Sequence, residues 1–340
     1  MAGFKTTSVS ANLLERDLIG EKLALSSAGC YALIFVGSYC LASAHLAHLL
    51  PREREAAGIA FAVQLACVAP RAFQRLTSAR GPRTGSQSFA LMVNAISMAS
   101  NLAMFLWPMP IVVDPTTHTR NHLARWSQWS VLAGSTMFAV EAVDATSFWW
   151  PLALGVSIGA STFSAMILPF IRNRALWNAV LGFAFVTYGA IFPRLRYKMR
   201  ELAAMGESAH AEALERKIRL GAACRLLGSC AAMWTVFVAN YFVAWAGQAW
   251  HIAGSGAAYP QWPFVLDCFI DVFCKLVFTD IIHEGLHAAR QLYEEQQARA
   301  RKRDSRYSAP RRPRGRRPAA TLCTALPADA PRARARCVRP

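Results

Sequence analysis

The chain has 340 residues, of which 54% are hydrophobic and only 17% are charged. Ordinary soluble domains carry about 25% charged residues, so this composition argues against a soluble protein. Apolar windows of about 20 residues recur as far as residue 290, which is typical of a protein that crosses a membrane several times. The nine cysteines show neither metal-ligand spacing nor a disulfide framework, so we predict no metal site.

The net charge of +17 is concentrated at one end of the sequence. Residues 299–340 contain fourteen Lys or Arg and two Asp, which gives +12 for this segment alone. Such a Pro-, Arg- and Ala-rich segment lacks the apolar content to fold, and we expect a disordered tail in contact with anionic lipid headgroups. Nothing else favours a nucleic-acid partner, so the expected surroundings are a lipid bilayer and no nucleic acid.

The apolar segments predict eight membrane spans. In chain order they are 26–50, 56–76, 88–113, 123–143, 148–171, 176–193, 220–248 and 262–288. A polar, mixed-charge segment at 1–25 precedes them. The fold class that follows is an all-α, polytopic membrane helix bundle.

Loop charges predict the orientation of these spans. The basic stretches at 78–86 and 194–219 fall on the same side as the Arg-rich tail, which should be the cytoplasm. The loops at 114–121 and 249–261 fall on the other side. With eight spans, both termini are predicted to be cytoplasmic.

One charged residue lies in the middle of the last span. Lys275 has long apolar runs on both sides, and an intramembrane lysine indicates a functional site. Asp271 lies one helical turn earlier on the same face and is its expected partner. A desolvated amine can condense with an aldehyde to form a Schiff base. The alternative is a buried Lys–Asp pair that only fixes helix packing.

Two other spans carry aromatic and charged residues at helical spacing. On the fourth span, Arg125 lies one turn from Trp129. On the seventh span, Trp234, Phe237 and Tyr241 form one stripe, although such a stripe alone most often reflects packing.

The order of these motifs along the helices resembles the microbial (type I) rhodopsin family, whose lysine binds retinal as a Schiff base. The resemblance covers 56–290, and it implies a seven-helix, retinal-binding rhodopsin domain with all-trans retinal as cofactor. An extra helix at 26–50 resembles the layout of the eight-span enzyme-linked (sensory) rhodopsins. The segment 1–25 is then a cytoplasmic lead-in, and 291–340 is a helix extension followed by the disordered tail.

The resemblance implies a role for each matching residue. Lys275 matches the retinal lysine, Asp271 its counterion and Arg125 the arginine below the Schiff base. Trp129, Trp234, Phe237 and Tyr241 match the aromatic positions around retinal, and Trp177 lies at or one residue from another. Ala133 is also expected at the retinal site, where it departs from the Thr-Pro that the family usually has there. Large flat side chains suit a retinal site because they bury a long apolar chromophore.

Two departures from the family pattern bear on function. The position of the usual proton acceptor is Gln128, and the position of the cytoplasmic proton donor is Ala139. An amide cannot take a proton, so outward proton pumping is not expected. With Asp271 as the one evident anion, we expect either a lowered pKa of the Schiff base or a requirement for a bound anion.

The remaining charged residues of these helices have less specific predictions. Glu141 and Asp144 are interpreted as carboxylates at the helix end, or alternatively as a relay for protons or ions. Asp267 and Asp280 are expected near the membrane interface. His283 and His287 lie one turn apart, and we interpret them as part of a solvated helix exit.

Two functions follow from the resemblance. The first is a light-sensing photoreceptor, not an enzyme, without a catalytic site of its own and acting through a cytoplasmic signalling partner or as part of a longer protein. A short coiled-coil-like seam favours a homo- or hetero-oligomer; its residues are Ile282, Leu286, Ala289 and Tyr293. The second is a light-gated anion channel or anion transporter, because Gln128 removes a fixed negative charge from the path. A membrane scaffold without retinal is a third.

Overall fold

The computed structural model describes residues 8–77, 85–142, 145, 147–205, 211–251 and 261–308. The helices within these residues are α1 (Ser8–Leu41), α2 (Pro51–Thr77), α3 (Gly85–Leu106), α4 (Leu123–Ala142), α5 (Trp149–Ile167), α6 (Arg174–Gly189), α7 (Ile191–Ala204), α8 (Ala211–His251) and α9 (Trp262–Ser308). Single 3-10 turns follow α1 (η1, Ser43–His45) and α5 (η2, Leu168–Phe170). The chain divides into two compact units, Met1–Tyr293 and Glu294–Pro340.

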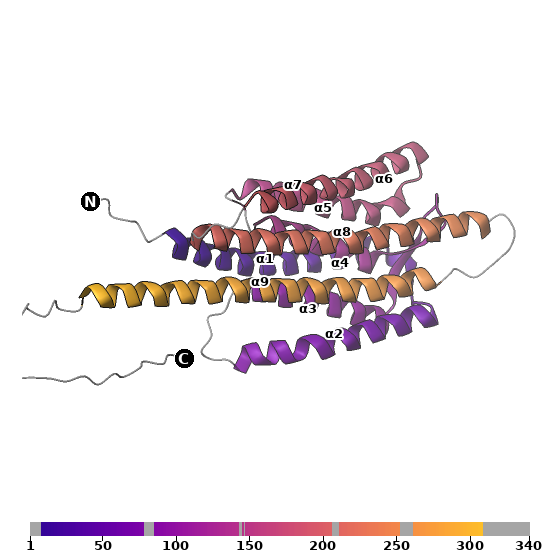
Figure 1. Ribbon diagram of the computed structural model, residues 1–340. Coiled ribbons are helices and arrows are strands. Elements are labelled where there is room, and N and C mark those ends of the chain that lie inside the picture. Colours follow the sequence, from indigo (N-terminus) through magenta and orange to yellow (C-terminus); the bar gives the residue numbers. More distant parts are fainter. Residues whose placement is uncertain are drawn as a thin grey trace, which may run out of the picture. The chain divides into compact units, whose positions relative to one another are not determined.

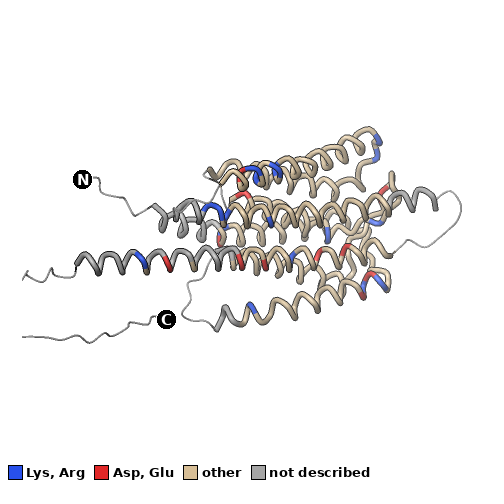
Figure 2. The backbone as a smooth tube through the Cα atoms, in the orientation of Figure 1, with Lys and Arg blue, Asp and Glu red and all other residues tan. Residues whose placement is uncertain are grey.

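Helices of the first unit run along a common direction (Figure 1). Six helical segments of the described residues are long and apolar enough to cross a bilayer: Gly20–Leu41, Pro51–Phe73, Gln87–Leu106, Trp149–Phe170, Arg174–Ala204 and Arg216–Val243. Charged residues gather near helix ends, whereas several lie along the middle of α9 (Figure 2). The protein is therefore an integral, multi-pass membrane helix bundle, which confirms the predicted fold class.

The first and third helices differ clearly from the predicted spans. The first helix starts at Ser8 and ends at Leu41, so it begins earlier and ends sooner than the expected 26–50. The third helix stops at Leu106 because Pro108 and Pro110 cannot continue a helix.

A small antiparallel sheet follows this stop and was not predicted. Its strands are β1 (Leu46–Ala47), β2 (Met109–Val113) and β3 (Arg120–His122), in the order β1-β2-β3. Leu46 pairs with Pro110, and Ile111 pairs with His122. The β-branched run Ile111–Val113 suits a strand, which explains why the apolar stretch to Val113 is not all helix.

The predicted basic stretch after the sixth span is largely helical. Helix α7 follows α6 after a single residue, Ala190, and packs against α8. The described part of this stretch ends at Met205 and resumes at Ala211. The predictions for 78–84, 252–260, Asp144 and the tail beyond 308 lie outside the described residues, as do the side chains of His283, His287 and most of the predicted seam.

Two buried apolar clusters lie on either side of Lys275 along α9. Val272 belongs to the first cluster, with Phe264, Cys268 and residues of α2 and α3. Phe278 belongs to the second cluster, with residues of α3, α4 and α8. The lysine is thus placed between two packed layers, away from the helix ends.

Helices α4 and α5 touch through backbone at three glycines. A Cβ atom added to Gly134 would lie 2.8 Å from the carbonyl oxygen of Gly155 and 3.2 Å from Cα of Gly159. Real side chains do not approach so closely, so these helices can pack at this distance only without a side chain at Gly134.

We expect Gly134→Ala to destabilise the protein by about 1–3 kcal/mol, because the added methyl group must push two backbones apart. Gly182→Ala on α6 is the matched control, since nothing lies within 4 Å of its Cβ position. Denaturant unfolding of the purified variants in detergent measures both free energies of unfolding. Equal stability of the two variants would show that the helices can separate without cost.

Candidate functional site

The centre of the site is a buried ion pair on α9. Lys275 is 7% exposed and Asp271 is 2% exposed, and they lie four residues apart. The Lys275 ammonium donates a hydrogen bond to Oδ1 of Asp271. A buried charge is stable only with a partner and further hydrogen bonds, and Asp271 provides the partner predicted from the spacing.

Asp271 accepts hydrogen bonds from two further helices. Nε1 of Trp129 donates to Oδ1 at 2.7 Å, and Nε2 of Gln128 donates to Oδ2 at 2.8 Å, both from α4. Ser97 Oγ on α3 donates to Oδ2 at 3.0 Å. With the lysine, four donors surround this carboxylate, so both its position and its negative charge are fixed by α3, α4 and α9 together.

Arg125 lies on the β-sheet side of this pair. Its Nη2 donates to Oδ1 of Asn101 at 3.3 Å and to Sγ of Cys268 at 2.9 Å. Its guanidinium carbon is 4.5 Å from the ring centre of Phe264, a cation–π distance. The Nε and Nη1 groups are buried without a hydrogen-bond partner among the described residues, so the guanidinium retains unused donors.

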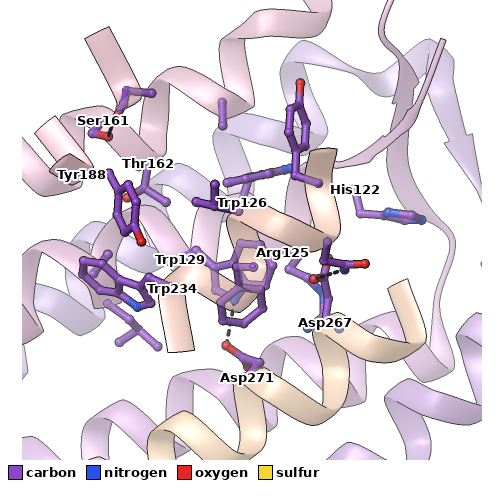
Figure 3. Close-up of a pocket in the computed structure, with 18 of the residues that line it drawn as sticks. His122, Arg125, Trp126, Trp129, Ser161, Thr162, Tyr188, Trp234, Asp267 and Asp271 are labelled. Carbon is purple, nitrogen blue, oxygen red and sulfur yellow. Dashed lines mark hydrogen bonds between the residues drawn. The ribbon is translucent and has the colours of Figure 1, made fainter. Parts of the chain in front are cut away.

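A cavity of about 300 Å³ reaches both Lys275 and Arg125. Its aromatic walls come from α4, α6, α8 and α9, as Trp126, Trp129, Phe185, Tyr188, Trp234, Phe237, Tyr241, Phe264 and Phe278. The rings of Trp129 and Phe237 are 4.6 Å apart. Figure 3 shows Trp129 directed at Asp271, with Tyr188 and Trp234 on the opposite side of the cavity. The arrangement suits a long, apolar and partly flat ligand.

Most of the residues singled out in the sequence meet at this cavity. Lys275, Asp271, Arg125, Trp129, Ala133, Trp234, Phe237 and Tyr241 all line it. Gln128 lies behind the wall and contacts Asp271. Trp177 is buried elsewhere, where its Nε1 donates to Oδ2 of Asp114 at 2.9 Å. Where α6 borders the cavity, the wall is formed by Phe185 and Tyr188 instead of Trp177. Their i, i+3 spacing on α6 could have indicated this in the sequence.

Asp267 also lines the cavity, contrary to its expected position near the interface. It accepts a hydrogen bond from Nδ2 of Asn240 on α8 at 2.7 Å. The spacing of Asp267, Asp271 and Lys275, four residues each, places all three on one face and could have revealed it. Asp280 is half exposed and pairs with Arg71 at 2.5 Å, as expected near an interface.

Glu141 is buried rather than solvated at the helix end. Arg194 Nη2 lies 2.6 Å from its Oε2, and Lys198 Nζ lies 3.3 Å from the same oxygen. Because both cations lie on α7, this carboxylate ties the far end of α4 to α7. Glu141 thus lies at the end of α4 as expected, but it is buried in ion pairs rather than solvated.

The polar end of the cavity lies at the small sheet. Arg120 pairs with Glu53 at 2.9 Å, and His122 Nε2 lies 3.6 Å from the same carboxylate, beyond hydrogen-bond distance. Burial lowers the pKa of His122 below its usual 6.5, although Glu53 opposes this shift. Burial therefore favours the neutral form of this imidazole.

Within the described residues, no group of three or more His, Cys, Asp or Glu side chains is placed to hold a metal ion. The polar groups of the cavity come instead as amide, hydroxyl and paired charged side chains.

The architecture is similar to that of a rhodopsin phosphodiesterase from Salpingoeca rosetta. The crystal structure of its transmembrane domain has 14% sequence identity and a TM-score of 0.54, covering 83% of this chain and 100% of that one. The crystal structure with the linker region has 13% identity and a TM-score of 0.56, covering 80% and 96%. No family model matches the sequence, and no curated protein matches it in sequence. The chain thus has a microbial-rhodopsin-like fold.

We expect Trp129→Phe to lower the free energy of unfolding of the ligand-free protein by about 1.5–3 kcal/mol. The variant keeps a flat ring but removes a hydrogen bond to the charged Asp271. Trp126→Phe is the control, because that ring lies edge-on to Trp129 at 5.0 Å and donates no hydrogen bond within the described contacts. Denaturant unfolding in detergent compares them, and equal losses would contradict a role for the indole N–H.

Proposed function

We propose that this protein is a light-sensing photoreceptor that binds all-trans retinal as a Schiff base to Lys275. The observation that supports this most directly is a buried amine at the wall of an aromatic cavity. An amine held in an apolar site is expensive to keep charged, and the neutral form is the nucleophile that reacts with an aldehyde.

The residues present fit such a ligand. The cavity is of ligand size, its walls are flat rings, and Lys275 is the amine among its lining residues. Retinal bound there would supply absorption of light and a change of shape. The lysine gives the attachment point, and Trp129 and Phe237 restrict the space beside it.

Asp271 has the second role in this proposal. It lies in contact with the Lys275 nitrogen and would stabilise positive charge on that atom. Because Trp129, Gln128 and Ser97 also donate to it, its carboxylate cannot turn away without losing three hydrogen bonds. A displacement of the nitrogen would therefore be passed to α3 and α4.

Proton pumping is not proposed. Gln128 uses its amide N–H to donate to Asp271, and its side chain has no group that could accept a proton at neutral pH. At the other end of α4, Ala139 has no titratable group. Neither the acceptor nor the donor position is therefore equipped for vectorial transfer.

Signalling through a cytoplasmic partner fits the layout better. The similar protein from Salpingoeca rosetta is a rhodopsin phosphodiesterase, and its matched part is the transmembrane domain. Here α9 contains Lys275 and continues to Ser308, so one helix connects the site to the segment that precedes the basic tail. We propose that both termini are cytoplasmic, that the protein acts as an oligomer and that the partner is contacted there.

The test is pigment formation with all-trans retinal. We expect an absorption band in the visible or near-ultraviolet range that is lost in Lys275→Ala. Lys275→Arg is the charge-matched control, because a guanidinium still faces Asp271 but does not form an imine. A band in either variant would overturn the proposal, as would a colourless wild-type protein that is folded.

A light-gated anion channel is the second candidate, and a buried polar seam favours it. The residues Gln64 of α2, Asn94, Ser97, Ser100 and Asn101 of α3, and Gln128 of α4 are all fully buried. Asn101 Nδ2 donates to Oε1 of Gln64 at 3.1 Å, and Nε2 of Gln64 has no partner within the described residues. The row itself consists of uncharged amides and hydroxyls, which can face a passing anion, and Asp271 borders it only where Ser97 and Gln128 donate to that carboxylate.

Photocurrents separate the two candidates. Under voltage clamp in two chloride gradients, a channel gives currents whose reversal potential follows chloride. We expect no current in wild-type protein that has an intact photocycle, because the seam is closed by hydrogen bonds. A chloride-dependent current absent in Lys275→Ala would replace the signalling proposal with the channel.

A further inference from the structure

The charges around Lys275 and Arg125 include that of Asp267, a residue that the family resemblance did not assign to the site. At this depth of the cavity there are two cations, Lys275 and Arg125, and two carboxylates, Asp271 and Asp267. The remaining charged groups of the lining are at the sheet end, where Arg120 pairs with Glu53 and Asp114 accepts backbone N–H groups of its own turn. Asp267 is therefore, beside Asp271, the second carboxylate that acts on Arg125.

We propose that Asp267 is a second counterion of the Lys275 site and supplies the negative charge that Gln128 lacks. This inference rests on the proposed function, because it concerns the positive charge on the Lys275 nitrogen. Asp267 is a positioning residue here: it acts on that charge through the electric field and through Arg125, without touching the nitrogen.

The placement of Asp267 supports this role. It lies two helical turns from Lys275, about 12 Å along α9, and lines the same cavity. The groups that face it are the Arg125 guanidinium from α4, Asp271 from its own helix and the Asn240 amide from α8. Arg125 contacts Cys268, the next residue on α9, so the guanidinium is held beside Asp267.

The hydrogen bonds of the two carboxylates fit different roles, with Asp271 in contact with the lysine and Asp267 acting at a distance. Asp271 accepts from four donors, including the lysine. Asp267 accepts only from Asn240 within the described contacts, at 2.7 Å. Arg125 retains two donors without a partner. If Asp267 were absent, Arg125 would leave an uncompensated positive charge beside Lys275, and that charge would oppose a positive charge on its nitrogen.

The test is a pH titration of the absorption spectrum after reconstitution with all-trans retinal. We expect the visible band of Asp267→Asn to give way to the near-ultraviolet band at a pH about one unit lower than in the wild type. A shift of this size is the expected effect of one unit charge on the pKa of a group about 12 Å away in a partly polar interior. Asp267→Glu keeps the charge and should titrate within about 0.3 units of the wild type.

Asp280→Asn is the matched control, since it removes a carboxylate from the same helix where the side chain is half exposed and paired with Arg71. Its titration should not move. A midpoint of Asp267→Asn equal to that of the wild type would overturn the inference while leaving the retinal proposal intact. A wild-type protein that forms no pigment would count against the retinal proposal instead.

A second measurement needs no ligand and tests the charge balance itself. Asp267→Asn, Arg125→Gln and the double variant are compared by the Tm of the ligand-free protein. If Asp267 compensates Arg125, the double variant loses less stability than the sum of the single losses, because no unpaired charge remains. Additive losses would overturn the inference. Should Asp267→Asn fail to fold, Asn240→Ala, which removes its donor, should move the titration in the same direction.

Discussion

The structure depends on one buried ammonium and the groups that neutralise it. A charge in the middle of a membrane helix is costly, and neighbouring helices reduce that cost only if they place donors and acceptors at fixed positions. Asp271 does this from α9, and Ser97, Gln128 and Trp129 complete the hydrogen bonds of Asp271 from α3 and α4. Three helices therefore converge on one carboxylate, and the cavity beside it is lined largely by aromatic rings.

The fold and the central pair could be predicted from the sequence because both depend on local pattern. Apolar length determines a membrane helix, and a spacing of four residues determines that Asp271 and Lys275 share a face. The small sheet was missed because Ile111–Val113 is apolar like the helix before it, and only the prolines at 108 and 110 mark the change. The end of the first helix at Leu41 has no comparable signal, since the apolar residues continue beyond it.

The parts of the site that could not be predicted depend on tertiary contacts. Asp267 looks like a residue near the helix end when only its own helix is considered, but α4 and α8 enclose it with Arg125 and Asn240. Glu141 was interpreted as interfacial because its partners, Arg194 and Lys198, lie more than fifty residues away. Trp177 was assigned by position along the chain, whereas the rotation of α6 presents Phe185 and Tyr188 to the cavity.

The distribution of buried charge has a consequence for how the protein is made. Helix α9 contains Asp267, Asp271 and Lys275 within three turns, and no segment of it is among the six that are apolar enough to cross a bilayer. On insertion scales each such residue opposes entry of an isolated helix by about 2.5–3.5 kcal/mol. Since α3 and α4 precede α9 in the chain, the donors Ser97, Gln128 and Trp129 are synthesised before Asp271. We therefore expect α9 to insert together with its contacts to α3 and α4, and not by partitioning into the lipid as an isolated helix.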